Sequence, residues 1–104
     1  MPKLITVMWR DIPAQIIAKE QRRSVKVKLS ERFADAIDRA AMRAGKGSSD
    51  AYLADWRRVT ETCGADLQTA AESAAAKYER DYDDARLLKL IRNKGDEPAA
   101  SDGG

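Results

Sequence analysis

The chain has 104 residues, which is room for one ordinary domain and excludes a second. A composition of 43% hydrophobic and 35% charged residues with a net charge of +2 is that of a folded protein with a thin core. The sequence contains no histidine and one cysteine, Cys63. These counts exclude catalytic triads that use histidine, histidine-bearing zinc sites, Cys-x-x-Cys redox motifs and an internal disulfide. We therefore expect a protein without catalytic residues, cofactor or metal.

Three segments of strand character open the chain. Residues 4–9 are rich in β-branched and aromatic side chains, and Pro13 after them cannot donate a ladder hydrogen bond, so a strand and then a turn are predicted. Residues 14–19 and 24–29 predict two more strands joined by a polar turn, and the last alternates apolar residues with lysines, which leaves one face in water. The apolar run at 4–9 is too short for a signal peptide or a membrane span. Together with the single thiol, this favours the cytoplasm.

The middle of the chain predicts a helix, a loop and a fourth strand. Ser30 can cap a helix over residues 31–44, whose apolar side chains recur at helical spacing, and Gly45 is a typical C-terminal stop. Residues 50–63 combine helical and strand preferences. We interpret them as a short helical turn that runs into a strand at about 55–62.

From residue 65 onward the spacing of apolar residues predicts a long helix, and the aspartates at 81–84 favour a break followed by a second helix at about 83–93. The polar, glycine-rich end predicts a domain at 1–93 and a disordered tail at 94–104. The expected class is α+β, with three or four antiparallel strands packed on one face by the 31–44 helix and the C-terminal helix. One stripe of the C-terminal helix should face the core: Leu67, Ala71, Ala74, Tyr78, Tyr82, Ala85 and Leu88.

Two segments place a tryptophan beside arginine, a pairing that is common in protein interfaces. One segment ends the first predicted strand and the other enters the fourth. The alternative is that both tryptophans pack in the core while the arginines reach outward to water. The candidate partner-binding residues are Trp9, Arg10, Asp11, Gln15, Tyr52, Trp56, Arg57 and Arg58.

A basic segment around the second turn offers a different site, for an anionic ligand or a nucleic acid. It lacks the aromatic side chains on which single-stranded bases stack, so a protein partner is favoured over nucleic acid. The acidic residues at 79–84 do not match a calcium loop, because the glycine and the distal glutamate of such a loop are missing, and they are interpreted as a solvated helix start. The candidate anion-binding residues are Lys19, Arg22, Arg23, Lys26 and Lys28.

Four strings resemble a known family: WRDIPAQ at 9–15, ERFADAIDRAAMRAG at 31–45, SDAYLADWRR at 49–58 and YDDARLLKLIR at 82–92. The family consists of small bacterial proteins described as virulence factor domains, and the same module forms part of a larger protein, conserved virulence factor C. The resemblance covers nearly the whole chain except the last ten residues, and it implies no catalytic motif. Members of this family often lie beside genes for folate- and corrinoid-dependent methyl transfer, so the resemblance implies an accessory role in such a system.

We therefore expect a non-catalytic interaction or accessory module with a protein partner and no association with membranes, and the sequence leaves the oligomeric state open. The alternative is a binding module for an anionic ligand or nucleic acid that uses the basic segment 19–32. An enzyme that uses Arg10, Asp11 and Arg57 would require both tryptophan segments to line one concave pocket.

Overall fold

Four strands and four helices lie along residues 1–45 and 49–97, which are the residues that the computed structural model describes. Each corresponds to an element expected from the sequence, including the short helical turn before the fourth strand and the break in the C-terminal helix. The elements are β1 (Lys3–Trp9), β2 (Ile12–Glu20), β3 (Arg23–Lys28), α1 (Glu31–Arg43), α2 (Ser49–Ala54), β4 (Trp56–Thr62), α3 (Leu67–Asp81) and α4 (Asp84–Arg92).

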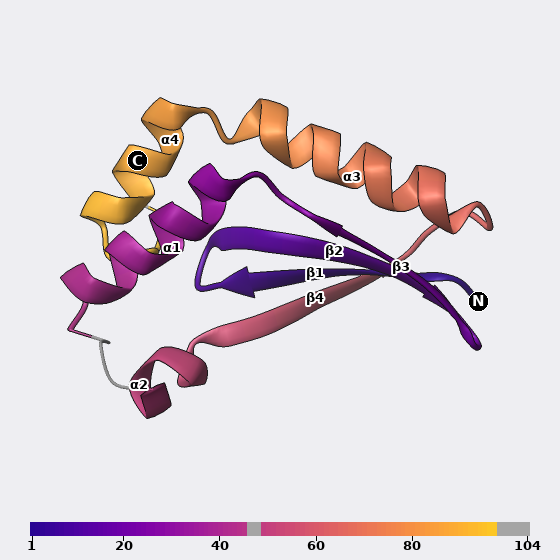
Figure 1. The fold of residues 1–104 in the computed structure, drawn as a ribbon, viewed down its shortest axis with the longest axis horizontal. Coiled ribbons are helices and arrows are strands. Elements are labelled where there is room, and N and C mark those ends of the chain that lie inside the picture. The colour runs from indigo at the N-terminus through magenta and orange to yellow at the C-terminus, as the bar shows by residue number, and fades with distance from the viewer. Residues whose placement is uncertain (46–48, 98–104) are drawn as a thin grey trace.

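The strands form one antiparallel sheet in the order β3-β2-β1-β4, which confirms the α+β class (Figure 1). The first three strands form two consecutive hairpins, β1–β2 and β2–β3. The chain then forms α1 and α2 before β4 pairs with β1 at the other edge of the sheet. Val7 pairs with Gln15 but Met8 pairs with Pro13, so Ala14 forms a bulge in β2. The bulge lets Pro13 fit into the strand near its end, where a residue without a backbone N–H is tolerated.

One face of the sheet is covered by α3, which packs on β2 and β3 (Figure 1). Ile16 and Ala18 of β2 are 0% exposed beneath it, and the hydroxyl groups of Thr6 and Tyr78 lie 3.3 Å apart. Because successive side chains of a strand point to opposite faces, the residues next to these belong to the other face. The α3 face carries two rows of paired side chains: Glu61, Leu4, Ala18 and Val25, and then Val59, Thr6, Ile16 and Val27.

α1 lies at the end of the sheet that carries the β1–β2 turn, where it packs against α4 and β2 (Figure 1). Its Phe33 is 0% exposed, with its ring centroid 6.0 Å from that of Tyr82. Ile37 borders a groove whose floor includes Val7, a residue of the face opposite α3. α1 thus covers the end of the sheet, and its buried side chains belong to the same core cluster as those of α3.

The helix break occurs at Tyr82 and Asp83, and it resets the phase of the apolar stripe. The Asp83 carboxylate accepts a hydrogen bond of 2.8 Å from the Arg86 backbone N–H and so caps α4. The continuous stripe predicted from the sequence is wrong beyond this point, since Ala85 and Leu88 are exposed. Leu87 and Leu90 are buried instead.

The start of α1 also differs from expectation in one detail. Ser30 is the N-cap residue, but its side chain makes no capping hydrogen bond within the helix. Its hydroxyl and backbone N–H donate instead to the two carboxylate oxygens of Glu79, at 2.8 and 2.6 Å. Residue 30 thus ties the start of α1 to the end of α3.

Residues 94–97, which the composition assigned to the polar tail, pack against the β1–β2 turn. Asp11 donates its backbone N–H to the Gly95 carbonyl at 2.9 Å, and Gly95 is buried. Residues 98–104 lie outside the described residues, so the predicted domain boundary stays a prediction there. In the part of the chain that the structure describes, no helix is long and apolar enough to cross a membrane.

Candidate functional site

The first tryptophan segment is built into the fold. Trp9 is 0% exposed, its indole Nε1–H donates to the Tyr52 carbonyl at 2.9 Å, and its ring stacks on the Tyr52 ring with the centroids 6.0 Å apart. Gly95 lies against the same indole, so closely that a Cβ there would be 2.6 Å from Trp9 Cζ3. The turn formed by Trp9, Arg10 and Asp11, which we call the WRD turn, is thereby held between α2 and the residues after α4.

Arg10 and Asp11 have partners within the chain. Arg10 takes a positive φ of 53°, lies with its guanidinium carbon 5.0 Å from the Trp9 ring centroid, and pairs with Asp55 at 3.1 Å. The Asp11 carboxylate accepts from the Arg57 guanidinium at 2.9 Å and from the Glu97 backbone N–H at 2.7 Å. These contacts connect the WRD turn to the start of β4 and to the end of the chain that the structure describes.

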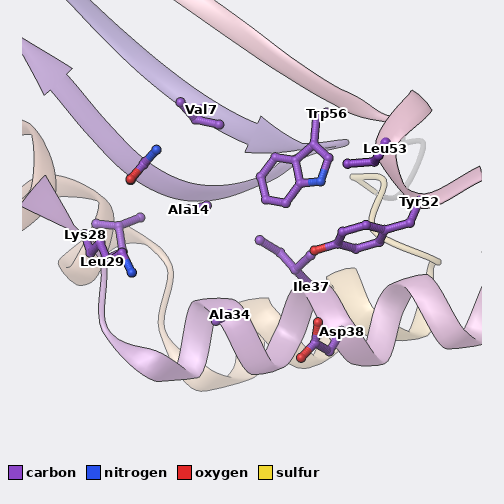
Figure 2. A pocket seen from close by; sticks show the side chains of 11 residues that line it. Val7, Ala14, Lys28, Leu29, Ala34, Ile37, Asp38, Tyr52, Leu53 and Trp56 are labelled. Carbon is purple, nitrogen blue, oxygen red and sulfur yellow. The ribbon is translucent and has the colours of Figure 1, made fainter. Parts of the chain in front are cut away.

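The second tryptophan segment lines a groove, which Figure 2 shows from close by. The groove has a volume of about 500 Å³. Its floor is formed by Val7, Ala14 and Gln15, with Lys28 and Leu29 at one end. Ala34, Ile37 and Asp38 of α1 form one wall, and Tyr52, Leu53 and Trp56 form the other (Figure 2). We call this cavity the α1–α2 groove.

The side chains of the aromatic wall of the α1–α2 groove pack against one another and stay partly exposed. Tyr52 is partly buried, its ring packs edge-on against Trp56 with centroids 5.8 Å apart, and its other side stacks on Trp9. Burial raises the pKa of the Tyr52 hydroxyl, with the Asp38 carboxylate acting in the same direction and a hydrogen bond from Trp56 opposing it. Leu53 at the rim is 61% exposed. A large aliphatic side chain beside two aromatic rings is thus presented to solvent.

The structure divides the predicted partner-binding residues into three places. Trp9, Arg10, Asp11 and Arg57 belong to the WRD turn and its contacts, Gln15, Tyr52 and Trp56 line the α1–α2 groove, and Arg58 lies on the face opposite α3. Residues of both tryptophan segments line this one groove, namely Ala14 and Gln15 of the first segment and Trp56 of the second. Trp9 and the three residues named for an enzyme, Arg10, Asp11 and Arg57, do not line it. Contact with a partner stays a prediction for all eight. Sequence reasoning missed Leu53, Ile37 and Val7 as groove residues, because the positions of α1 and α2 relative to the sheet decide which side chains line the groove.

The face of the sheet opposite α3, which we call the open face, gathers much of the basic segment. We restrict the name to the first three rows of this face, which contain twelve residues: none of them belongs to the core cluster, and eight are exposed. The next row, Trp56, Trp9 and Ile12, is half-buried or fully buried. Lys19, Lys26 and Lys28 lie on the open face. Lys3 and Arg58, which the sequence did not link to them, lie there too. Arg22 lies in the β2–β3 turn, and Arg23 stands opposite Glu20 in the β2–β3 ladder, off the open face. The three rows are Thr62, Lys3, Lys19 and Ser24; Thr60, Ile5, Ile17 and Lys26; and Arg58, Val7, Gln15 and Lys28.

Glu79, near the end of α3, connects this helix to the start of α1. Glu79 accepts from Ser30 and pairs with Arg32 at 3.1 Å, and Arg32 also donates to the Tyr82 carbonyl. Burial opposes ionisation of Glu79, but the hydrogen bonds from Ser30 and Arg32 outweigh it and lower the pKa of this carboxyl. Within the described residues, no three acidic or cysteine side chains are grouped closely enough to hold a metal ion.

Comparison with known proteins gives one positive result. A search of curated proteins found no match, and a search of solved structures found none either. The model of a protein family described as "Virulence factor" matches residues 7–91, which include the WRD turn, the α1–α2 groove and both capped C-terminal helices. The match extends over far more than half of the 104 residues. The chain therefore belongs to the virulence factor family.

Proposed function

We propose that this chain is a non-catalytic interaction module that binds a protein partner in the α1–α2 groove. The observation that carries the proposal is the exposed Leu53 beside Tyr52 and Trp56 at the edge of a groove of about 500 Å³. Aromatic side chains in a pocket are common anchors of protein interfaces. The apolar residues around them release water when a partner binds.

The support also includes the way in which the groove is fixed. The Tyr52 ring packs between the rings of Trp9 and Trp56. Three residues further along the chain, Asp55 forms an ion pair with Arg10. A surface that is already ordered in the free protein loses little conformational entropy on binding, so more of its contact energy appears as affinity. In this proposal the WRD turn acts as a positioning element, and Tyr52, Leu53 and Trp56 make the contact.

We further propose that the partner belongs to a folate- or corrinoid-dependent methyl-transfer system. The support for this is the resemblance of the WRDIPAQ segment, residues 9–15, to family members found beside such genes. A search for the partner should begin with the proteins of that system.

Affinity capture with three forms of the chain tests the proposal. The variant Leu53→Asp places a charge at the groove, whereas Leu88→Asp makes the same change at a 43% exposed position of α4 outside the groove. Both should fold normally, because surface substitutions usually change stability by less than about 0.5 kcal/mol. We expect one protein to be retained by the wild-type chain and by Leu88→Asp, and to be lost with Leu53→Asp. Equal recovery by all three forms would contradict the use of the groove.

A further inference from the structure

The open face carries charge of one sign. Among its twelve side chains are five basic residues and no acidic one, although the whole chain has a net charge of only +2. In the part of the chain that the structure describes, none of the five forms an ion pair. Their field is therefore not neutralised within the molecule, and it attracts an anionic partner. The five are Lys3, Lys19, Lys26, Lys28 and Arg58.

The basic residues surround an apolar strip. Ile5 and Val7, which are half-buried, lie on β1, and Ile17, which is 8% exposed, lies beside Ile5 on β2. The aliphatic side chains therefore occupy the two central strands. Lys26 and Lys28 lie on one edge strand, and Arg58 lies on the other. An apolar strip with cations on both borders is the complement of an amphipathic helix that has carboxylates on both sides of its apolar stripe.

The size of the open face suits one helix. Neighbouring strands are separated by ~4.8 Å, so four strands measure about 14 Å from edge to edge. An α-helix with its side chains is about 10–12 Å in diameter. The strip also continues into the α1–α2 groove, because Val7, Gln15 and Lys28 belong to both.

We propose that the partner presents an acidic amphipathic helix that lies along the open face and reaches the α1–α2 groove with one end. This inference rests on the proposed function and adds the chemistry of the partner. Apolar residues of the helix contact Ile5, Val7 and Ile17, and its carboxylates approach the lysines of β3 and Arg58 of β4.

Other occupants of the open face fit less well. A nucleic acid would find cations but no aromatic ring within these three rows, and the rings of the adjoining α1–α2 groove, Tyr52 and Trp56, pack against each other. A second copy of the chain would bring five more cations against the first five and would be repelled. Residues 98–104 of the same chain contain one acidic residue, Asp102, and no apolar residue larger than proline or alanine.

Titration of the ¹⁵N-labelled full chain, followed by NMR, tests the inference with defined probes. The first probe is a synthetic peptide of about 18 residues, ~27 Å long as a helix, with a leucine stripe flanked by glutamates. The second is the same peptide with every glutamate replaced by glutamine, and the third is a single-stranded oligothymidylate. We expect the glutamate peptide to shift the amide signals of Ile5, Val7 and Ile17. Its affinity should exceed that of the glutamine peptide by about tenfold or more, and salt should weaken it.

Paired variants locate the charge effect. Lys26→Glu combined with Lys28→Glu should weaken binding of the glutamate peptide by about tenfold, because both lysines lie on the open face. Arg22→Glu combined with Arg92→Glu makes the same change in net charge at exposed positions off this face, and it should weaken binding by less than about threefold.

Three results would overturn the inference: no binding of the glutamate peptide, equal binding of the glutamine peptide, or tighter binding of the oligonucleotide at the same amides. The failure of the inference can be told apart from the failure of the proposed function. A captured partner that depends on Leu53 but binds the Lys26→Glu, Lys28→Glu variant normally would leave the groove proposal standing and would refute the acidic helix.

Discussion

Gly95 should be a position where a single methyl group strongly destabilises the fold. Its φ of +96° is one that L-residues rarely adopt, and a Cβ would lie 2.6 Å from Trp9 Cζ3 and 3.1 Å from Cε3. The indole cannot withdraw easily, because it is fully buried and hydrogen-bonded to the Tyr52 carbonyl. We therefore consider the variant Gly95→Ala.

The magnitude follows from two terms. An alanine forced to a positive φ costs about 1–2 kcal/mol of folding free energy. Overpacking against a side chain that is fixed in the core costs about 1–3 kcal/mol more. Gly45 provides the matched control, because its φ is +73° but nothing lies within 4 Å of its Cβ position, so Gly45→Ala incurs the first term alone.

Equilibrium unfolding in urea, followed by circular dichroism, measures the difference. Gly95→Ala should be less stable than Gly45→Ala by about 1–3 kcal/mol. At a denaturant slope of about 1–3 kcal/mol per molar, its midpoint should lie roughly 1 M lower. Equal midpoints for the two variants would refute the close contact between Gly95 and Trp9, and with it the proposal that the end of the chain holds the WRD turn.

Three further predictions concern the two tryptophans, an arginine and a carboxylate. In Trp56→Phe the remaining indole, Trp9, is 0% exposed, so acrylamide should quench its fluorescence much less than that of the wild-type chain; equal quenching would contradict the buried placement. Arg10→Ala should lower the free energy of unfolding by about 1–3 kcal/mol, because Arg10 loses its bonds to Asp55 and the Lys94 carbonyl. Arg58→Ala, on the open face, should change it by less than about 0.5 kcal/mol. Similar losses in the two variants would contradict a stabilising role of the Arg10 contacts. Because the pKa of Glu79 is lowered from 4.5, its carboxylate adds stability above that pH and loses it as the pH falls through the folded-state value. Glu79→Gln should therefore cost roughly 1–2 kcal/mol at neutral pH and lose less stability on acidification than the wild type; identical acid profiles would show that Glu79 contributes nothing.

Local patterns were sufficient to predict the elements of the fold. The alternation of valine and lysine in residues 24–29 predicted a strand with one face in water, and the structure places Lys26 and Lys28 on the open face. Asp83 marked the helix break because a short carboxylate side chain competes for backbone N–H groups, and it caps α4 as expected. In both cases the signal and the structure involve residues a few positions apart.

Contacts between distant residues could not be read from the sequence. Ser30 bonds to Glu79 and Asp11 bonds to Glu97, and no periodicity connects positions so far apart. For the same reason the two Trp-Arg segments looked alike in sequence, yet Trp9 is fully buried and Trp56 borders a groove. The difference arises because Tyr52 of α2 and Gly95 lie against the Trp9 indole, whereas the Trp56 indole is partly accessible at the groove.

Site-specific photo-crosslinking tests the use of the α1–α2 groove most directly. A photoreactive phenylalanine analogue replaces Leu53, which is 61% exposed at the rim of the groove, or Leu88, which is 43% exposed on α4, in the full chain inside cells. We expect a crosslink from position 53 to one defined protein, through a peptide rich in acidic and apolar residues, and no such product from position 88. The same products from both positions, or none from position 53, would contradict it.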